Sequence, residues 1–269
     1  MRRIGALPAA PFSNPITEAR GMIYAILLFV VLVTSTISGV FGMAGGLMLM
    51  GALALVLPVS AAMVTHGMVQ IVANGWRGVL HRAHIDWRIV ALYGVGAALA
   101  GGALALVAYA PSKAWVYLLL GLIPALAWLP KDVLRLDAAR APDALFCGFG
   151  VTGLNVAAGV AGPLLDVFFI RTALTRHQIV ATKAATQVLS HLTKVAFYGA
   201  PLLTAANQNG MPPLWFFLAA APLAMWGGAI GRRILDRLSD KSFLSWTRWI
   251  VTGLGALYLA QAARLFFAG

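Results

Sequence analysis

The segment from Thr65 to Arg77 recurs in the second half of the chain as the segment from Thr182 to Lys194. In the same register, both copies carry a threonine, a basic or titratable residue, a glutamine, a further polar residue and a cation. On a helix, at about 100° per residue, the last four positions fall within roughly 80° of arc. These positions are His66, Gln70, Asn74 and Arg77 in the first copy and Lys183, Gln187, His191 and Lys194 in the second. Each copy therefore predicts an apolar helix with one polar stripe.

The rest of the sequence is apolar enough to place these helices in a membrane. Hydrophobic residues make up 61% of the chain and charged residues 10%, whereas charged residues make up about a quarter of a soluble domain. A net charge of +12 would suggest a nucleic-acid partner for a soluble chain. Here most Lys and Arg residues lie in short connections between apolar segments, as in membrane proteins. We therefore expect an all-α polytopic protein in a lipid bilayer, with no nucleic-acid partner.

The order of segments predicts two similar halves. Residues 1–20 read as a soluble tail, 21–129 as a first membrane repeat, 130–143 as a cytoplasmic connector and 144–269 as a second repeat. Each half contains a glycine-broken helix pair, a striped helix and two plain spans, which makes 8 to 10 hydrophobic segments in all. The expected segments are 21–42, 47–57, 60–80, 89–109 and 114–129 in the first half, and 144–156, 164–170, 176–198, 214–230 and 243–267 in the second.

Charge predicts the orientation of these segments. The loops at 81–88, 131–143, 171–177 and 232–248 hold 12 of the 20 Lys and Arg residues, so the positive-inside rule places them in the cytoplasm. The two striped helices then cross in opposite directions, as in an inverted repeat. Both termini would lie outside a cell inner membrane. Each broken pair could be a re-entrant hairpin or two crossings, since both return the chain to its starting side.

Three stretches carry a resemblance to a known family. They are the glycine cluster 39–47, the basic loop 81–88 with Asp86 and Trp87, and the second glycine cluster 148–163. With the two striped helices, the chain resembles the TauE/SafE family of sulfite and organosulfur-anion exporters over most of residues 22–267. The resemblance implies a secondary transporter of small oxyanions or sulfonates, coupled to protons or to the membrane potential, with no ATP and no prosthetic group. The chain departs from the family pattern at Ala44, Asn155, Ala157, Ala158, His66 and Lys183.

Broken helices predict where an anion binds. Transporters with inverted repeats bind substrate near the bilayer midplane, at helix starts with unpaired backbone N–H groups. Pieces beginning near Gly45, Gly46 and Gly162 would supply such groups, although these glycines could also serve packing alone. Gln70 and Gln187 could donate amide hydrogens, together with Asn74 and His191. Asn155, near the second break, could contact the substrate or cap a half-helix.

The charged and titratable residues have competing interpretations. Lys183 within a span needs either an anionic partner or a function. Asp166 could be that partner, or it could instead be a proton site. His66 could gain a proton between about pH 5 and 8 and so link anion binding to protons, while His66 and His191 could instead join helices. Arg77 and Lys194 could gate or steer the anion, or could reach the interface from their helix ends.

These observations favour a secondary transporter for a small sulfur-containing anion, working by alternating access. An anion-selective channel and a transporter of a non-sulfur organic anion are the alternatives. An enzyme is disfavoured because the sequence has no paired carboxylates or activated nucleophile. No Cys–His cluster predicts a metal site, and the single Cys147 rules out an intrachain disulfide. The sequence leaves the oligomeric state open.

Overall fold

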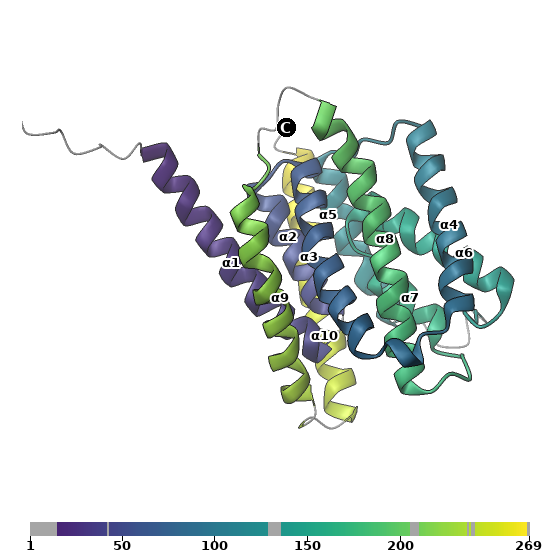
Figure 1. Ribbon diagram of the computed structural model, residues 1–269. Coiled ribbons are helices and arrows are strands. Elements are labelled where there is room, and N and C mark those ends of the chain that lie inside the picture. Colours follow the sequence, from purple (N-terminus) through teal and green to yellow (C-terminus); the bar gives the residue numbers. More distant parts are fainter. Residues whose placement is uncertain are drawn as a thin grey trace, which may run out of the picture.

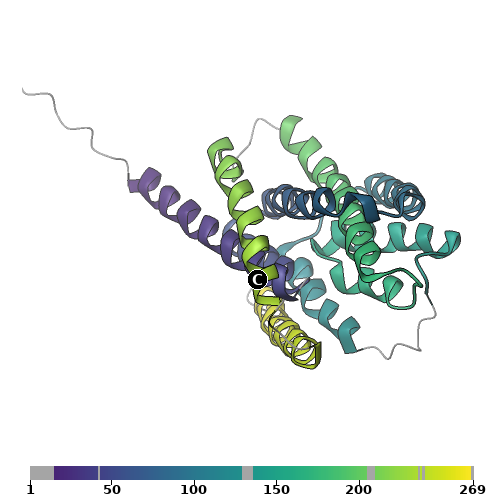
Figure 2. The ribbon, with the colours of Figure 1, turned by 60° about the horizontal axis from the view of Figure 1, so that its bottom comes forward.

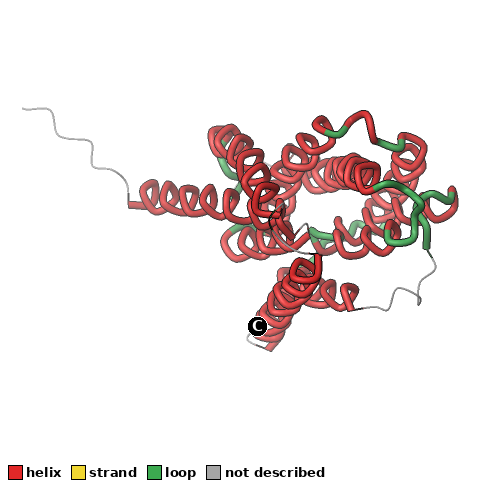
Figure 3. Tube along the Cα trace, turned by 90° about the horizontal axis from the view of Figure 1, so that it is seen from below, coloured by secondary structure: helices red, strands yellow, loops and turns green. Residues whose placement is uncertain are grey.

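The computed structural model describes residues 15–41, 43–128, 136–204, 210–235, 237 and 240–267. All regular structure in these ranges is helical (Figure 1, Figure 3). The first half contains α1 (Pro15–Phe41), α2 (Met43–Val56), α3 (Val59–Leu80), η1 (Arg82–His84), α4 (Trp87–Leu106), α5 (Lys113–Leu122) and η2 (Ile123–Trp128). The second half contains α6 (Ala141–Ala158), α7 (Gly162–Phe169), α8 (Arg176–Thr204), α9 (Leu214–Leu235) and α10 (Asp240–Phe267).

Both expected helix breaks are present. The first lies between the end of α1 at Phe41 and the start of α2 at Met43, since the two helices fold back on each other and a Cβ on Gly45 would lie 2.0 Å from the carbonyl oxygen of Thr34. The second follows α6, where Gly159 has a φ of 87° and its N–H bonds to the carbonyl of Asn155 at 2.8 Å. Glycine adopts this left-handed conformation at little cost, so it ends α6 and lets the chain turn into α7.

Several helix limits differ from the expected ones. α1 begins at Pro15, before the expected end of the tail at residue 20, and residues 1–14 lie outside the described ranges. α8 continues to Thr204 instead of ending near Tyr198, because Pro201 lies inside its last turns without ending the helix. The first six residues of the expected connector, 130–135, are also outside the described ranges, and α6 begins at Ala141 within the connector.

The helices pack in a pattern that pairs the two halves. α1 lies along α9 on one flank and α4 lies along α6 on the other (Figure 1, Figure 2). Between these flanks α3 packs against α8, and α5 packs against α10. In Figure 1 the ends of α3 and α9 and the starts of α4, α8 and α10 all lie on the lower side. The basic segments 81–88, 171–177 and 232–235 are therefore on one side of the molecule.

Among the described residues, four helices are long and apolar enough to cross a membrane: Ala19–Phe41, Trp87–Leu106, Leu214–Leu235 and Arg248–Phe267. Their windows are at most 33% buried within the molecule, so most of their apolar surface faces outward. The striped helices α3 and α8 are not among the four, since their polar side chains lower the mean hydropathy. They pack against each other between the two flanks, and each also has an outward face, with Met68 and Trp76 exposed on α3 and Leu192 exposed on α8.

Glycines allow the flanking helices to approach closely. A Cβ atom on Gly148 of α6 would lie 2.1 Å from the carbonyl oxygen of Tyr93, and one on Gly96 of α4 would lie 2.1 Å from that of Leu145. On the other flank, a Cβ on Gly231 of α9 would lie 2.7 Å from the Cα of Gly39. Backbone contacts of this kind are typical of small residues in membrane helix packing.

Replacing Gly148 with alanine should therefore destabilise the protein by about 1–3 kcal/mol, because the added methyl group meets backbone that cannot move aside. A Cβ added to Gly153 on the same helix would meet no atom of another element within 4 Å, so Gly153→Ala should be neutral or slightly stabilising. Thermal unfolding of the detergent-purified variants, followed by tryptophan fluorescence, compares them. Equal melting temperatures for the two variants would contradict the close packing of α4 on α6.

Candidate functional site: a positively charged cavity between the two halves

A cavity of about 1220 Å³ lies between the two broken pairs and the two striped helices. It brings together twelve of the thirteen residues that the sequence singles out. They are Gly45, Gly46, His66, Gln70, Asn74, Arg77, Asn155, Gly162, Asp166, Lys183, Gln187 and His191. The thirteenth, Lys194, lies behind the wall and is fully buried.

Helix periodicity explains why these side chains converge. α3 and α8 pack against each other, and each stripe occupies a narrow arc of its helix. The stripes therefore share one space. Residues at both glycine breaks also line this space, namely Gly45, Gly46 and Gly162. At the first break, Gly46 lies close to α3. A Cβ on Gly46 would lie 2.8 Å from Nε2 of Gln70 and 3.8 Å from Nε2 of His66.

The cavity wall carries far more positive than negative charge. Asp166 is the one acidic lining residue in the described ranges, whereas the basic ones are Arg77, Arg176, Lys183, Arg232, Arg233 and Arg248. Arg176, Arg232 and Arg233 are exposed at the ends of α8 and α9. The cavity therefore opens at the side of the molecule where the basic segments gather, and its potential attracts anions.

Histidines add to the rim of this opening. The ring of His177 lies 6.3 Å from that of His81 and 5.4 Å from that of His84. Burial, followed by the charge of Arg232, lowers the pKa of His81, so this side chain is mostly neutral at pH 7. No group of His, Cys, Asp or Glu in the described ranges is placed to hold a metal ion.

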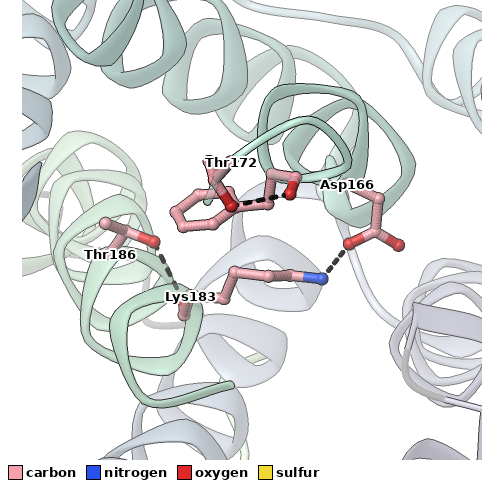
Figure 4. Close-up of polar contacts among 5 residues, drawn as sticks. Asp166, Thr172, Lys183 and Thr186 are labelled. Atoms are coloured by element: carbon pink, nitrogen blue, oxygen red, sulfur yellow. Dashed lines mark hydrogen bonds and ion pairs between the residues drawn. The ribbon is translucent and has the colours of Figure 1, made fainter. Parts of the chain in front are cut away.

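Lys183 and Asp166 form an ion pair across the cavity wall (Figure 4). The ammonium of Lys183 on α8 donates to Oδ1 of Asp166 on α7. The two side chains are 26% and 35% exposed, so water and solutes in the cavity reach them. Of the two alternatives for Lys183, an anionic partner or a function, the structure contains the anionic partner. The carboxylate of Asp166 balances the charge of Lys183.

Lys194 does not reach the membrane interface. The expectation that Lys194 extends to the interface from the end of its helix is wrong, because α8 continues to Thr204 and the Lys194 side chain is 0% exposed. Its ammonium lies 2.8 Å from Nδ1 of His66, 2.8 Å from the carbonyl oxygen of Gly159 and 3.3 Å from Oδ1 of Asn155. The residue thus connects α8 to α3 and to the end of α6 at the second break.

Polar contacts continue from Lys194 to the first break. Nε2 of His66 lies 3.1 Å from the carbonyl oxygen of Gly46. Asn155 donates from Nδ2 to Oγ of Ser190 at 2.8 Å and lies 3.3 Å from Nδ1 of His191. We call this set of six residues the buried network: Gly46, His66, Asn155, Gly159, His191 and Lys194. Along α8, Lys194 lies 18 residues beyond Arg176, so the network is at the end of the cavity away from the basic opening; we call this the closed end because the residues of the network are buried.

The model of the sulfite exporter TauE/SafE family matches residues 27–260, which is most of the chain. The chain belongs to the TauE/SafE family. This family is one of membrane transporters that export sulfur anions, so the protein is a multi-pass membrane transporter with a small anionic substrate. No curated protein and no solved structure matches the chain.

The family match spans both helix breaks, both striped helices and the basic opening of this TauE/SafE protein. Several residues of the cavity are not predicted by the sequence pattern, because a basic segment between helices indicates the side of the membrane and not a place in a site. These residues are Arg176, Arg232, Arg233 and Arg248 at the opening and Ser190 beside the buried network. The sequence feature that could have indicated them is their position: the arginines lie at or near the ends of predicted helices, and Ser190 lies within the second striped segment.

Proposed function

We propose that the protein is a secondary transporter that moves a small sulfur-containing anion, such as sulfite, thiosulfate or a sulfonate, across the cell inner membrane by alternating access. The observation that supports this most is the cavity itself. It is lined by both polar stripes, carries six cations against one acid among the described residues, and is open at one end and closed at the other. With the basic segments in the cytoplasm, both termini lie outside and the cavity faces inward.

The packing pattern supports a repeat, and the opposite directions of α3 and α8, which end and begin on the lower side of Figure 1, support its inversion. Exchanging the two halves converts the pair α1 and α9 into the pair α6 and α4, and leaves the central pair α3 and α8 unchanged. Close glycine contacts occur on both flanks, with Gly39 and Gly231 on one and Gly96 and Gly148 on the other. Two such halves can tilt against each other about a central site.

Equivalent residues of the two stripes differ in exposure, as expected for one state of an alternating cycle. His66 and Lys183 occupy matching positions, but His66 is 1% exposed whereas the Lys183 side chain is 26% exposed. Lys194 is buried, whereas Arg77, its match, lines the cavity. In the opposite state we expect the surroundings of His66 and Lys194 to become exposed and those of Lys183 and Arg77 to become buried.

The substrate contacts in this proposal come from the broken helices and the stripes. Backbone N–H groups near the breaks and the neutral side-chain donors hold the anion without adding fixed charge. The proposed contacts are Gly45, Gly46, His66, Gln70, Asn74, Asn155, Gly162, Gln187 and His191, whereas Lys183, the tenth candidate, pairs with Asp166 and balances its charge. His66 and Asp166 are the candidates for proton coupling, and Arg77 and Lys194 are the candidates for steering or gating.

A channel is the less favoured function because the buried network closes one end of the cavity. Lys194 is fully buried, and beside it Tyr198 donates to the carbonyl oxygen of Val156 at 2.8 Å. A continuous pore would need these groups to separate. A site that faces one side at a time instead requires a closed end.

Purified protein should unfold at a higher temperature in sulfite, thiosulfate or methanesulfonate than in chloride at equal ionic strength. A ligand at about 100 times its Kd stabilises the folded state by about 2.7 kcal/mol, which is several degrees. Taurine and acetate serve as zwitterion and carboxylate controls. The largest shift with acetate would favour a non-sulfur organic anion, and equal shifts in all salts would contradict a specific anion site.

A further inference from the structure

The hydrogen bonds of the buried network fix where its protons lie. The carbonyl oxygen of Gly46 only accepts, so Nε2 of His66 must carry a hydrogen. Lys194 then faces three acceptors: Nδ1 of a neutral His66, Oδ1 of Asn155 and the carbonyl oxygen of Gly159. An ammonium has three hydrogens and fills all three bonds, whereas a neutral amine has two and leaves one acceptor unfilled.

Moving the proton within this pair does not change its charge. If the proton moves from Nζ of Lys194 to Nδ1 of His66, the imidazolium donates to a neutral amine. Both arrangements carry one positive charge, and loss of the proton from the pair removes it. The pair therefore holds one charge on two side chains that are 0% and 1% exposed.

No carboxylate balances this charge among the described residues that bond to the pair. The partners of Lys194 and His66 are an amide, two backbone carbonyls and each other. The acid that lines the cavity, Asp166, is already paired with Lys183. A buried charge without a counter-charge is costly in a low-dielectric interior, so an anion at the closed end of the cavity would stabilise it.

We propose that the anion and one proton bind together at the closed end of the cavity, the proton on the Lys194–His66 pair and the anion beside His66, His191, Gly46 and Gln70. This deepens the proposed function by assigning the counter-charge of the substrate and the group that carries the coupled proton. When the anion leaves, the pair releases its proton to water in the cavity. Lys194 does not line the cavity, so it acts on the anion through its charge and through His66.

Other titratable groups near the pair have different partners. On α8, His191 accepts from Asn155 through Nδ1 and faces the His66 ring at 5.5 Å. Tyr198, also on α8, donates to the carbonyl oxygen of Val156 on α6. From α4, Tyr93 bonds to Thr152 of α6. Lys183 and Asp166, farther toward the opening, neutralise each other.

Isothermal titration calorimetry of the full-length protein in nanodiscs measures the coupled proton directly. Thiosulfate and methanesulfonate are the probes because both stay fully ionised near pH 7, so any proton taken up binds to the protein. Titration in two buffers of different ionisation enthalpy gives the number of protons bound per anion. We expect about one proton for the wild-type protein.

Two variants change the pair in different ways. Lys194→Met removes the charge, and we expect proton uptake to vanish and anion affinity to fall at least about tenfold. Asn155→Asp instead places a carboxylate beside Lys194, so the Lys194–His66 pair is already protonated before the anion binds. Proton uptake should therefore vanish and anion affinity should again fall. The hydrogen-bond donors of the network keep their partners in this variant. Lys113→Met, a lysine outside the cavity, is the matched control and should retain about one proton.

The outcomes separate the two proposals. Wild-type anion binding without proton uptake, or unchanged uptake in Asn155→Asp, would overturn the shared-proton inference and leave the transport proposal standing. If neither probe nor sulfite binds the wild-type protein, the proposed function fails and this inference fails with it.

Discussion

Replacing Lys183 with alanine should reduce anion flux into proteoliposomes by about tenfold or more, and adding Asp166→Asn should restore most of it. In the wild-type protein the ammonium of Lys183 balances the carboxylate of Asp166 on the cavity wall. Removing one member of such a pair leaves the other uncompensated. The single variant would therefore place an unpaired negative charge on the path of an anion, and the double variant would remove both charges.

Initial rates of labelled sulfite uptake, normalised to reconstituted protein, measure this effect. Asp166→Asn alone completes the cycle, and a thermal melt of each variant shows whether it is folded. Strong loss in Lys183→Ala with recovery in the double variant would assign Lys183 to charge balance. A double variant as inactive as the single one would contradict this, and would indicate direct contact between Lys183 and the anion.

The architecture could be predicted from sequence where local chemistry determines structure. Glycine clusters end helices because glycine adds flexibility and tolerates positive φ, and Gly159 does so at φ 87°. The stripes could be predicted because helical periodicity alone decides which side chains share a face. Their convergence on one cavity followed from the duplication of the pattern.

The surroundings of Lys194 could not be predicted in the same way. Its contacts with Asn155 and His66 join residues 39 and 128 positions apart in the chain, and no local pattern encodes such distances. The expected helix end near Tyr198 was also misleading, since Pro201 normally favours a helix end but here lies inside α8. With the helix ending there, Lys194 would be near an interface; with α8 continuing to Thr204, it is in the interior.

The second large effect concerns uphill exchange, which distinguishes a transporter from a channel. In the proposed function, the anion enters the cavity from the basic side while the buried network keeps the other side shut. A carrier of this kind can exchange an internal anion for an external one, so excess unlabelled sulfite inside vesicles drives labelled sulfite inward. A channel lets both anions run down their own gradients.

Counterflow in proteoliposomes is the most direct measurement of this account. Vesicles loaded with excess unlabelled sulfite are diluted into trace labelled sulfite, with the membrane potential clamped and protein-free liposomes as control. We predict that labelled sulfite rises transiently above its equilibrium level inside the vesicles and then declines, and that the initial rate saturates with external sulfite. A monotonic approach to equilibrium with no overshoot and no saturation would contradict alternating access.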